Sequence, residues 1–262
     1  MRADTTRLDL RIRRRSLIGY TIGIAIYAIT IVALYPSFKS DTSLNKLTEH
    51  GNAVAAIFGA SGPLTSPTGW LDANLYANFV PLIILLVTVG YGAASIAGQD
   101  EDGTLGLVAT LPTSRRRLVA EKFAAMCLLA LPAALATMLC VLAGVGFELH
   151  VDFAHLAGAT LGVLLLGIDF GALAMLIGAA TGSRGTALGT TAAIAAAAYI
   201  ISSLSPVVSW IHPLRYASPF FYAVGDSQLA NGISAGSAGA LVGLAALLAI
   251  ASNRAFRRLD IH

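Results

Sequence analysis

The sequence predicts an all-α membrane protein with six transmembrane helices and both termini in the cytoplasm. Hydrophobic residues make up 56% of the chain and charged residues 12%, whereas a soluble domain carries about 25% charged residues. A membrane-spanning helix needs about 20 mostly apolar residues, and six such stretches follow one another. They lack the polar alternation of outer-membrane strands, which run about 10 residues. The stretches are approximately Leu17–Tyr35, Tyr76–Ala97, Val119–Phe147, Leu156–Thr181, Thr186–Trp210 and Ile233–Ser252.

The distribution of basic residues orients these spans. Of the 17 lysines and arginines, Lys39, Lys46 and Arg215 fall in connections on one side of the membrane, and the rest fall on the other. Cytoplasmic connections are the ones enriched in Lys and Arg, so both termini are expected inside. The net charge of +3 therefore reflects topology and does not indicate a nucleic-acid partner.

The chain is expected to begin with a cytoplasmic interfacial arm over residues 1–16. A transmembrane domain over 17–252 and a cytoplasmic tail over 253–262 follow. The arm carries six arginines. The first apolar stretch is about 19 residues long, which exceeds a signal-peptide core, and Tyr35-Pro36 does not resemble a cleavage site of small residues. We therefore expect this stretch to be retained as the first span.

Three connections are long enough to carry function. Residues 36–75 form the longest outside segment, which includes a run rich in Gly and Pro that breaks regular structure. Residues 211–232 are aromatic and interrupted by Pro213 and Pro219, so they are expected to lie at the outer interface rather than to span. Residues 99–122 form the long cytoplasmic loop.

The loop 99–122 has a charge pattern that a simple connection does not need. It opens with acidic residues, continues through an apolar-patterned stretch to Pro112, and ends in arginines. Leu105 and Leu107 lie on one apolar face of a short helix predicted between Gly103 and Pro112. The helix dipole favours acidic residues at its N-terminal end. Such a helix, joined to two spans, is suited to transmit movement from a soluble partner; an inert interfacial loop is the alternative.

These residues resemble the permease subunits of ABC-2 type exporters, in particular those of actinobacterial antibiotic and multidrug exporters. The loop after the second span in that family typically reads A-G-E-E-x-x-G-T-L, followed by P-x-S-R-R and a Lys. Residues 97–105 and 111–122 are similar to this pattern, with Gln99 where the family usually has Glu. Weaker similarities are Ser218-Pro219-Phe220 with Asn231-Gly232 before the last span, and the tail at 256–261.

The resemblance implies a half-transporter of the type V exporter kind in the plasma (inner) membrane of a bacterium. Two permease subunits, identical or different, would form the pathway, with two copies of a soluble P-loop ATPase docked on their cytoplasmic loops. ATP and Mg²⁺ would bind that partner. This chain, which has no G-x-x-x-x-G-K-[ST] motif, is expected to bind no cofactor and to catalyse no reaction. The residues assigned to ATPase coupling are Asp100, Glu101, Gly103, Thr104, Leu105, Leu107, Pro112, Arg115 and Arg116.

The apolar spans favour a hydrophobic or amphiphilic cargo, such as a drug, an antibiotic or a lipid-like compound. Asp169, near the middle of the fourth predicted span, is the candidate pathway or substrate residue, because a charge at membrane depth is costly and usually faces protein, water or a partner. A neutral or hydrogen-bonded structural role is the alternative.

Two other functions compete with ATP-driven export. A proton- or ion-coupled secondary transporter using Asp169 should contain an inverted repeat, which the sequence does not display convincingly. The second is an intramembrane enzyme or a scaffold. An enzyme needs several convergent polar residues at membrane depth, where Asp169 is nearly alone, so this alternative ranks last.

The remaining reactive side chains have simpler interpretations. Glu148, His150, Asp152 and His155 crowd the predicted outside turn between the third and fourth spans and are of metal-ligand type. A solvated loop is commoner than a metal site there, so no metal is predicted. Cys127 and Cys140 lie about 20 Å apart along one helix, beyond disulfide reach.

Overall fold

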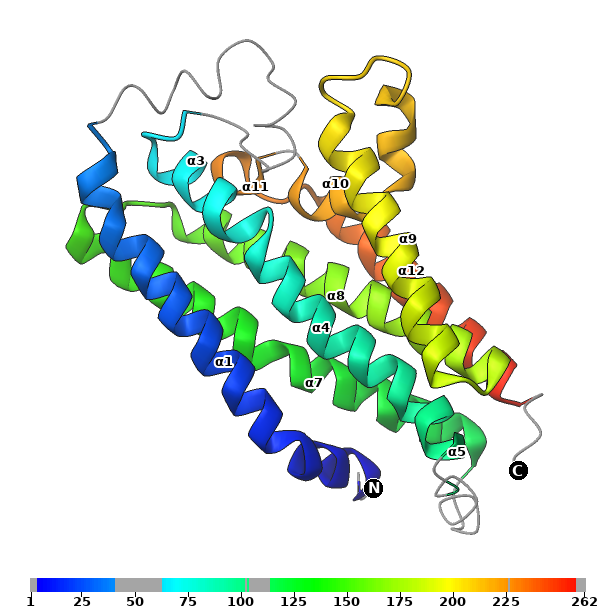
Figure 1. Ribbon diagram of the computed structural model, residues 1–262. Helices are drawn as coiled ribbons and strands as arrows, with labels where there is room; N and C mark the ends of the chain where they lie inside the picture. Colours follow the sequence, from blue (N-terminus) through cyan, green and yellow to red (C-terminus); the bar gives the residue numbers. More distant parts are fainter. Residues whose placement is uncertain (1–3, 41–62, 102, 104–113, 226, 258–262) are drawn as a thin grey trace.

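The computed structural model describes residues 4–40, 63–101, 103, 114–225 and 227–257. Over these ranges the chain is a helical bundle without strands (Figure 1). Six helical segments are long and apolar enough to cross a membrane, which confirms the predicted all-α class and the six spans. They are Thr5–Phe38, Pro67–Gly98, Arg116–Phe147, Phe153–Thr181, Arg184–Leu204 and Ala235–Phe256.

The first three spans differ in regularity. The first is one helix, α1 (Asp4–Phe38), so the N-terminal arm and the first apolar stretch are continuous. The second is built from shorter pieces that include two π-turns. These pieces are α3 (Pro67–Leu71), η2 (Asp72–Tyr76), α4 (Phe79–Ala93), η3 (Ala94–Gly98) and α5 (Gln99–Glu101). The third span is α7 (Arg115–Leu142), which the 3₁₀ turn η4 (Ala143–Phe147) extends.

The last three spans are regular helices. They are α8 (Phe153–Thr181), α9 (Arg184–Leu204) and α12 (Ala235–Phe256). Between the last two lie η5 (His212–Ala217), α10 (Pro219–Val224) and α11 (Gln228–Asn231), each too short to span. Four of the long helices begin at residues whose side chains accept main-chain N–H groups of the first turn, which satisfies donors that a helix start leaves unpaired. These capping residues are Ser114 for α7, Asp152 for α8, Ser183 for α9 and Ser234 for α12.

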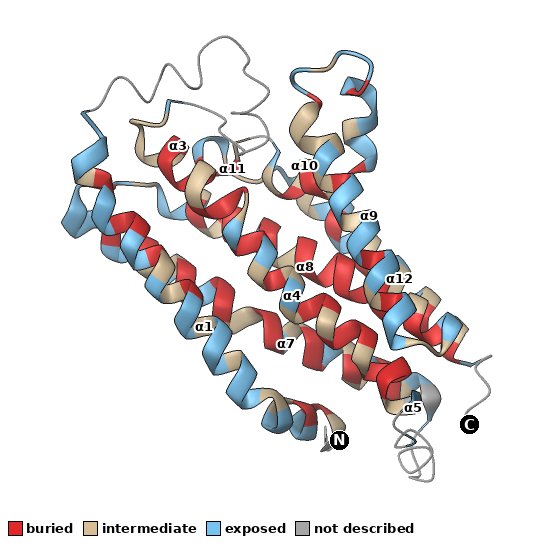
Figure 2. Cartoon of the chain, viewed as in Figure 1, coloured by how far each residue is buried: buried red, intermediate tan, exposed pale blue. Residues whose placement is uncertain are grey.

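Helix α8 is the centre of the bundle, and most of its length is buried (Figure 2). Glycines allow α4 to approach it closely. A Cβ atom on Gly92 of α4 would lie 2.2 Å from the carbonyl oxygen of Gly171 of α8. A side chain at position 92 is therefore excluded, and the two backbones meet directly, as small residues allow in membrane bundles.

Several span boundaries differ from the sequence-based expectation, and two of the differences have a clear physical reason. The second span begins at Pro67 rather than near Tyr76, because Trp70 packs into the bundle. Its indole N–H donates to the Ile31 carbonyl of α1 at 3.0 Å, and its ring stacks on Phe38. The fifth span ends at Leu204 rather than near Trp210, because Pro206 has no N–H to continue the helix.

The start of α1, the end of α5 and the end of α12 lie at the same end of the bundle (Figure 1). An even number of spans requires this arrangement of the two termini. The loop predicted to contact a partner thus shares one side of the protein with both termini.

Candidate functional site

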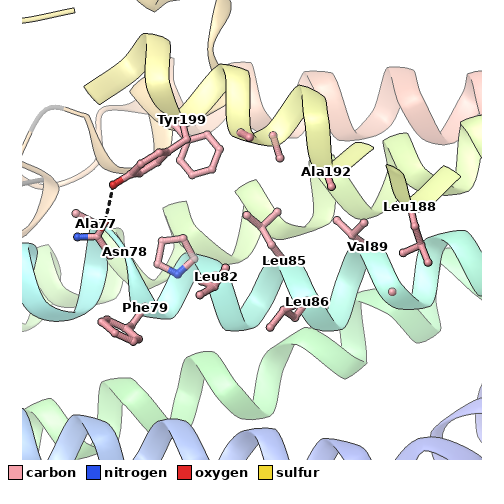
Figure 3. Close-up of a pocket in the computed structure, with 15 residues that line it drawn as sticks. Ala77, Asn78, Phe79, Leu82, Leu85, Leu86, Val89, Leu188, Ala192 and Tyr199 are labelled. Carbon is pink, nitrogen blue, oxygen red and sulfur yellow. Dashed lines mark hydrogen bonds between the residues drawn. The ribbon is translucent and has the colours of Figure 1, made fainter. Parts of the chain in front are cut away.

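An apolar groove of about 630 Å³ lies between α4 and α9, with Phe220 of α10 at its wall (Figure 3). It forms because the two helices present side chains of different size. Leu82, Leu85 and Leu86 line it from α4, whereas α9 contributes the alanines Ala192 and Ala195. Alanine is too short to fill the space opposite leucine, so a gap remains. This volume is typical of a site for a drug-sized molecule.

A polar pair closes one end of the groove. The Tyr199 hydroxyl of α9 donates to Asn78 Oδ1, just before α4, at 2.5 Å (Figure 3). Asn78 is held in turn, since its amide donates to the Ala73 carbonyl at 3.1 Å. The Tyr199 ring packs edge-on against Phe220, with centroids 5.4 Å apart. The groove therefore has a fixed polar end and an apolar body.

The groove extends along much of α4. From Asn78 to Gly90, both of which line it, the helix rises about 18 Å, more than half of a hydrocarbon core of about 30 Å. The polar pair lies at the end of α4 remote from α5. The groove body points toward the end of the bundle where α5 lies.

Glu101 joins the two walls of the groove at that end. It closes α5, which continues α4 through η3. Its carboxylate Oε1 accepts the main-chain N–H of Arg184, the first residue of α9, at 2.8 Å. An acidic group at a helix N-terminus is stabilised by the helix dipole. A displacement of Glu101 therefore acts directly on α9.

The predicted coupling residues are placed as follows. Glu101 and Arg116 are exposed, and Gly103 has φ of 66°, a left-handed conformation that glycine adopts without strain. Asp100 lies in α5 and Arg115 begins α7, with side chains outside the described part. Thr104, Leu105, Leu107 and Pro112 also lie outside the described residues, so the short helix between Gly103 and Pro112 stays a prediction.

Lys122, which ends the predicted loop, is buried and is not available to a soluble partner protein. Its side chain is 3% exposed, and its ammonium group bonds the carboxylate of Asp9 in α1. The sequence does not indicate the bond between Lys122 and Asp9, because Asp9 lies in a run of arginines that the membrane topology alone explains.

Asp169 is buried in α8 but does not line the groove. Among the described residues, neither of its carboxylate oxygens has a hydrogen-bond partner. One turn further along α8, the Ala172 carbonyl accepts the Ser252 hydroxyl of α12 at 3.4 Å. The structure thus does not bring Asp169 together with the groove.

The outside turn before α8 uses its polar groups locally. Asp152 accepts the N–H groups of Ala154 and His155 as the cap of α8, and Glu148 pairs with Lys39. In the part of the chain that the structure describes, no three His, Cys, Asp or Glu residues are placed to hold a metal ion.

A family model described as "ABC-2 family transporter protein" matches residues 6–261, nearly the whole chain. A search of curated proteins finds no match.

Proposed function

Because the chain belongs to the ABC-2 transporter family, we propose that it is the permease of an ATP-driven exporter in which the α4–α9 groove forms part of the pathway. As a member of this family, the chain is a membrane component of an ABC transporter and not itself a catalyst. The proposal adds the energy source, the direction of transport, the position of the pathway and the class of cargo.

The observation that carries the proposal is the bond between Glu101 and the N–H of Arg184. Glu101 lies at the start of the loop 99–122, which is the long cytoplasmic connection in the proposed topology, and α9 is one wall of the groove. A soluble ATPase that pushes on the loop would therefore shift α9 against α4. ATP hydrolysis by the soluble subunit would in this way change the width of the α4–α9 groove within the membrane.

The proposed partners follow from the same layout. Two copies of a soluble P-loop ATPase would bind ATP and Mg²⁺ and dock on the coupling residues, among them Asp100, Glu101 and Arg116. A second permease, identical or different, would complete the pathway. The membrane would be the bacterial plasma (inner) membrane, with both termini in the cytoplasm.

The groove lining supports a hydrophobic or amphiphilic cargo. Its walls are leucine, valine, alanine, phenylalanine, proline and glycine, and its polar side chains are those of Asn78 and Tyr199. An apolar body of a drug, an antibiotic or a lipid-like compound would be buried there through the hydrophobic effect. A strongly charged compound would find no counter-ion along the groove.

The test compares two tryptophan substitutions on α9. Ala192→Trp fills the groove, whereas Ala193→Trp adds the same bulk at an exposed position that does not line it. The permease would be purified together with its ATPase and reconstituted, and ATP-dependent uptake of a panel of amphiphilic dyes into inverted vesicles would be measured. We expect transport to be lost in Ala192→Trp alone. Transport that is equal in both variants, or independent of ATP, would refute the proposal.

A second candidate function, proton- or ion-coupled transport through Asp169, has one observation in its favour. A buried carboxylate whose oxygens lack partners among the described residues is costly to retain, which suits a group that binds a proton or cation during transport. Transport driven by an ion gradient without an ATPase would support this candidate.

A further inference from the structure

Lys122 and Asp9 form a buried ion pair between α7 and α1. The Lys122 ammonium donates to Asp9 Oδ2 at 2.8 Å and to Oδ1 at 3.1 Å. The two side chains are 3% and 9% exposed. Removing one partner of such a pair leaves an uncompensated buried charge, whereas removing both is often tolerated. The contact thus ties the first turns of α1 to the first turns of α7.

Two further groups from the second span complete the cluster. The Tyr91 hydroxyl of α4 donates to Asp9 Oδ2 at 2.5 Å. The Gln99 amide is oriented so that both of its polar atoms have partners. Its oxygen accepts from the Lys122 ammonium at 2.8 Å, and its nitrogen donates to the Ser95 carbonyl at 3.2 Å. Lys122 therefore contacts Asp9 of α1 and Gln99 of α5, and Asp9 also contacts α4.

The cluster closes the base of the coupling loop. Gln99 stands where the loop leaves the second span, and Lys122 lies about two turns into α7, so their hydrogen bond joins the two spans that the loop connects. Asp9 is the third anchor, and it comes from the N-terminal arm. Beside it, the Thr6 hydroxyl donates to the Glu121 carbonyl at 3.0 Å, and the Thr5 hydroxyl contacts the Glu121 carboxylate.

We propose that Asp9 is a positioning residue for coupling: through Lys122 it clamps the N-terminal turns of α1 to the base of the loop, so that α1, α4 and α7 respond to the loop together. This inference rests on the proposed function, because it assigns the arm a part in the same transmission. Without the clamp, a push on the loop would displace its base instead of shifting α9 against a firm α4.

The clamp also explains Gln99. Lys122 already has a carboxylate partner in Asp9, so a glutamate at position 99 would place a second negative charge against one ammonium. A neutral amide accepts the remaining N–H without that charge. Position 99 can therefore be used to move the acidic partner of Lys122 from α1 to α5.

Two double variants separate a clamp from simple charge balance. Asp9→Asn with Gln99→Glu leaves Lys122 with an acidic partner but removes the ionic link to α1. Asp9→Asn with Lys122→Met removes both charges and the link. Asp9→Asn alone is not used, since it strands a buried charge. Each variant also carries Ala192→Cys in the groove, with Cys127→Ala and Cys140→Ala, so that maleimide labelling reports ATP-dependent changes beside α9.

Both double variants should assemble, bind the ATPase and hydrolyse ATP. The ATP-dependent change in labelling of Ala192→Cys should fall by roughly tenfold, a size typical of coupling between sites. In the Asp9→Asn, Gln99→Glu variant without the reporter cysteine, a short bifunctional reagent across Thr5→Cys and Glu121→Cys should restore ATP-dependent dye uptake, because it rejoins α1 to α7. Labelling needs no knowledge of the cargo.

An undiminished ATP response in both double variants would overturn the clamp while leaving the proposed function intact. Failure of both to assemble would make the pair a folding element and would also overturn it. If the chain with native Asp9, Gln99 and Lys122 binds no ATPase or gives no ATP response, the proposed function fails and the clamp with it. Restoration by the cross-link would confirm the role in coupling.

Discussion

The Tyr199 hydroxyl and the Asn78 side chain, 121 positions apart, meet at 2.5 Å and join α9 to the start of α4. This hydrogen bond, called the latch below, holds α9 to α4 at one end of the groove. It is part-buried, so water can replace either side chain as the partner. A neutral hydrogen bond contributes about 1 kcal/mol net, so the latch can open and close readily.

Tyr199→Phe should loosen the latch while keeping the ring against Phe220. We expect faster labelling of Ala192→Cys by a membrane-impermeant maleimide added from the outside, because the outer end of the groove opens more often. Tyr216→Phe is the matched control, since its hydroxyl bonds Arg215 outside the groove. Equal labelling rates in the two variants would show that the contact does not gate access.

Glu101→Ala should uncouple α9 from the loop. The variant loses the carboxylate that accepts the Arg184 N–H, so hydrolysis should continue while the ATP-dependent labelling of Ala192→Cys falls several-fold. Glu101→Gln keeps an oxygen acceptor and should retain most of the response. Arg116→Ala, at an exposed coupling residue without a described bond to α9, should reduce the response less, because an exposed charge contributes little to an interaction. Loss of ATPase binding in Glu101→Ala would assign Glu101 to docking instead, and an unchanged response with the ATPase still bound would show that its bond to Arg184 does not transmit the movement.

Gly92→Ala should destabilise the bundle, because the new Cβ would lie 2.2 Å from the Gly171 carbonyl oxygen. Overpacking of this kind costs about 1–3 kcal/mol. Gly90→Ala is the control in the same helix, since its Cβ would meet nothing within 4 Å. Thermal unfolding in detergent should separate the two, and equal midpoints would contradict the close α4–α8 contact.

Topology is best tested at positions that do not cap helices. Ser66 and Ser114 both cap a helix, so cysteine at either would perturb what it reports. Arg116→Cys and His150→Cys replace exposed side chains at opposite ends of α7 and its extension. An impermeant reagent added to intact cells should label His150→Cys alone. Labelling of both from outside would reject the proposed orientation.

Asp169→Asn distinguishes the two candidate functions. For the exporter, whose groove Asp169 does not line, we expect ATP-dependent transport to persist and the protein to remain assembled. For an ion-coupled transporter, the same substitution should abolish gradient-driven transport. Measuring uptake with ATP alone and with an imposed proton gradient alone separates these outcomes.

The spans were predictable because each is a long apolar stretch, a property that needs no knowledge of its neighbours. The start of the second span was missed because Trp70 follows residues rich in Gly and Pro, and its burial depends on the Ile31 carbonyl and Phe38. The groove is also not predictable from the sequence, since the gap beside Ala192 appears only when α9 is known to lie along the leucines of α4.

The polar contacts between helices were the least predictable part. Asp9 and Lys122 are 113 positions apart, and both sit in basic or mixed-charge runs that the positive-inside rule explains without any contact. Glu101 was selected for its position in a loop motif, which predicted that it matters for coupling but not that it bonds the first residue of α9. Predicting such pairings requires knowing how the spans pack against one another, and the hydrophobic periodicity of a single helix does not give that information.

The glycine contact between α4 and α8 separates a rigid pair of helices from the helix that can move against it. Where two backbones touch, no side chain can change rotamer to absorb sliding, so we expect α4 and α8 to move together. In α9, 17% of the most apolar stretch is buried, against 67% in α8, so lipid or a second subunit surrounds much of it. We therefore expect α9 to be the helix that moves when the groove widens. An inhibitor that binds between α9 and α4 and fixes their distance would stop transport without contacting the ATPase.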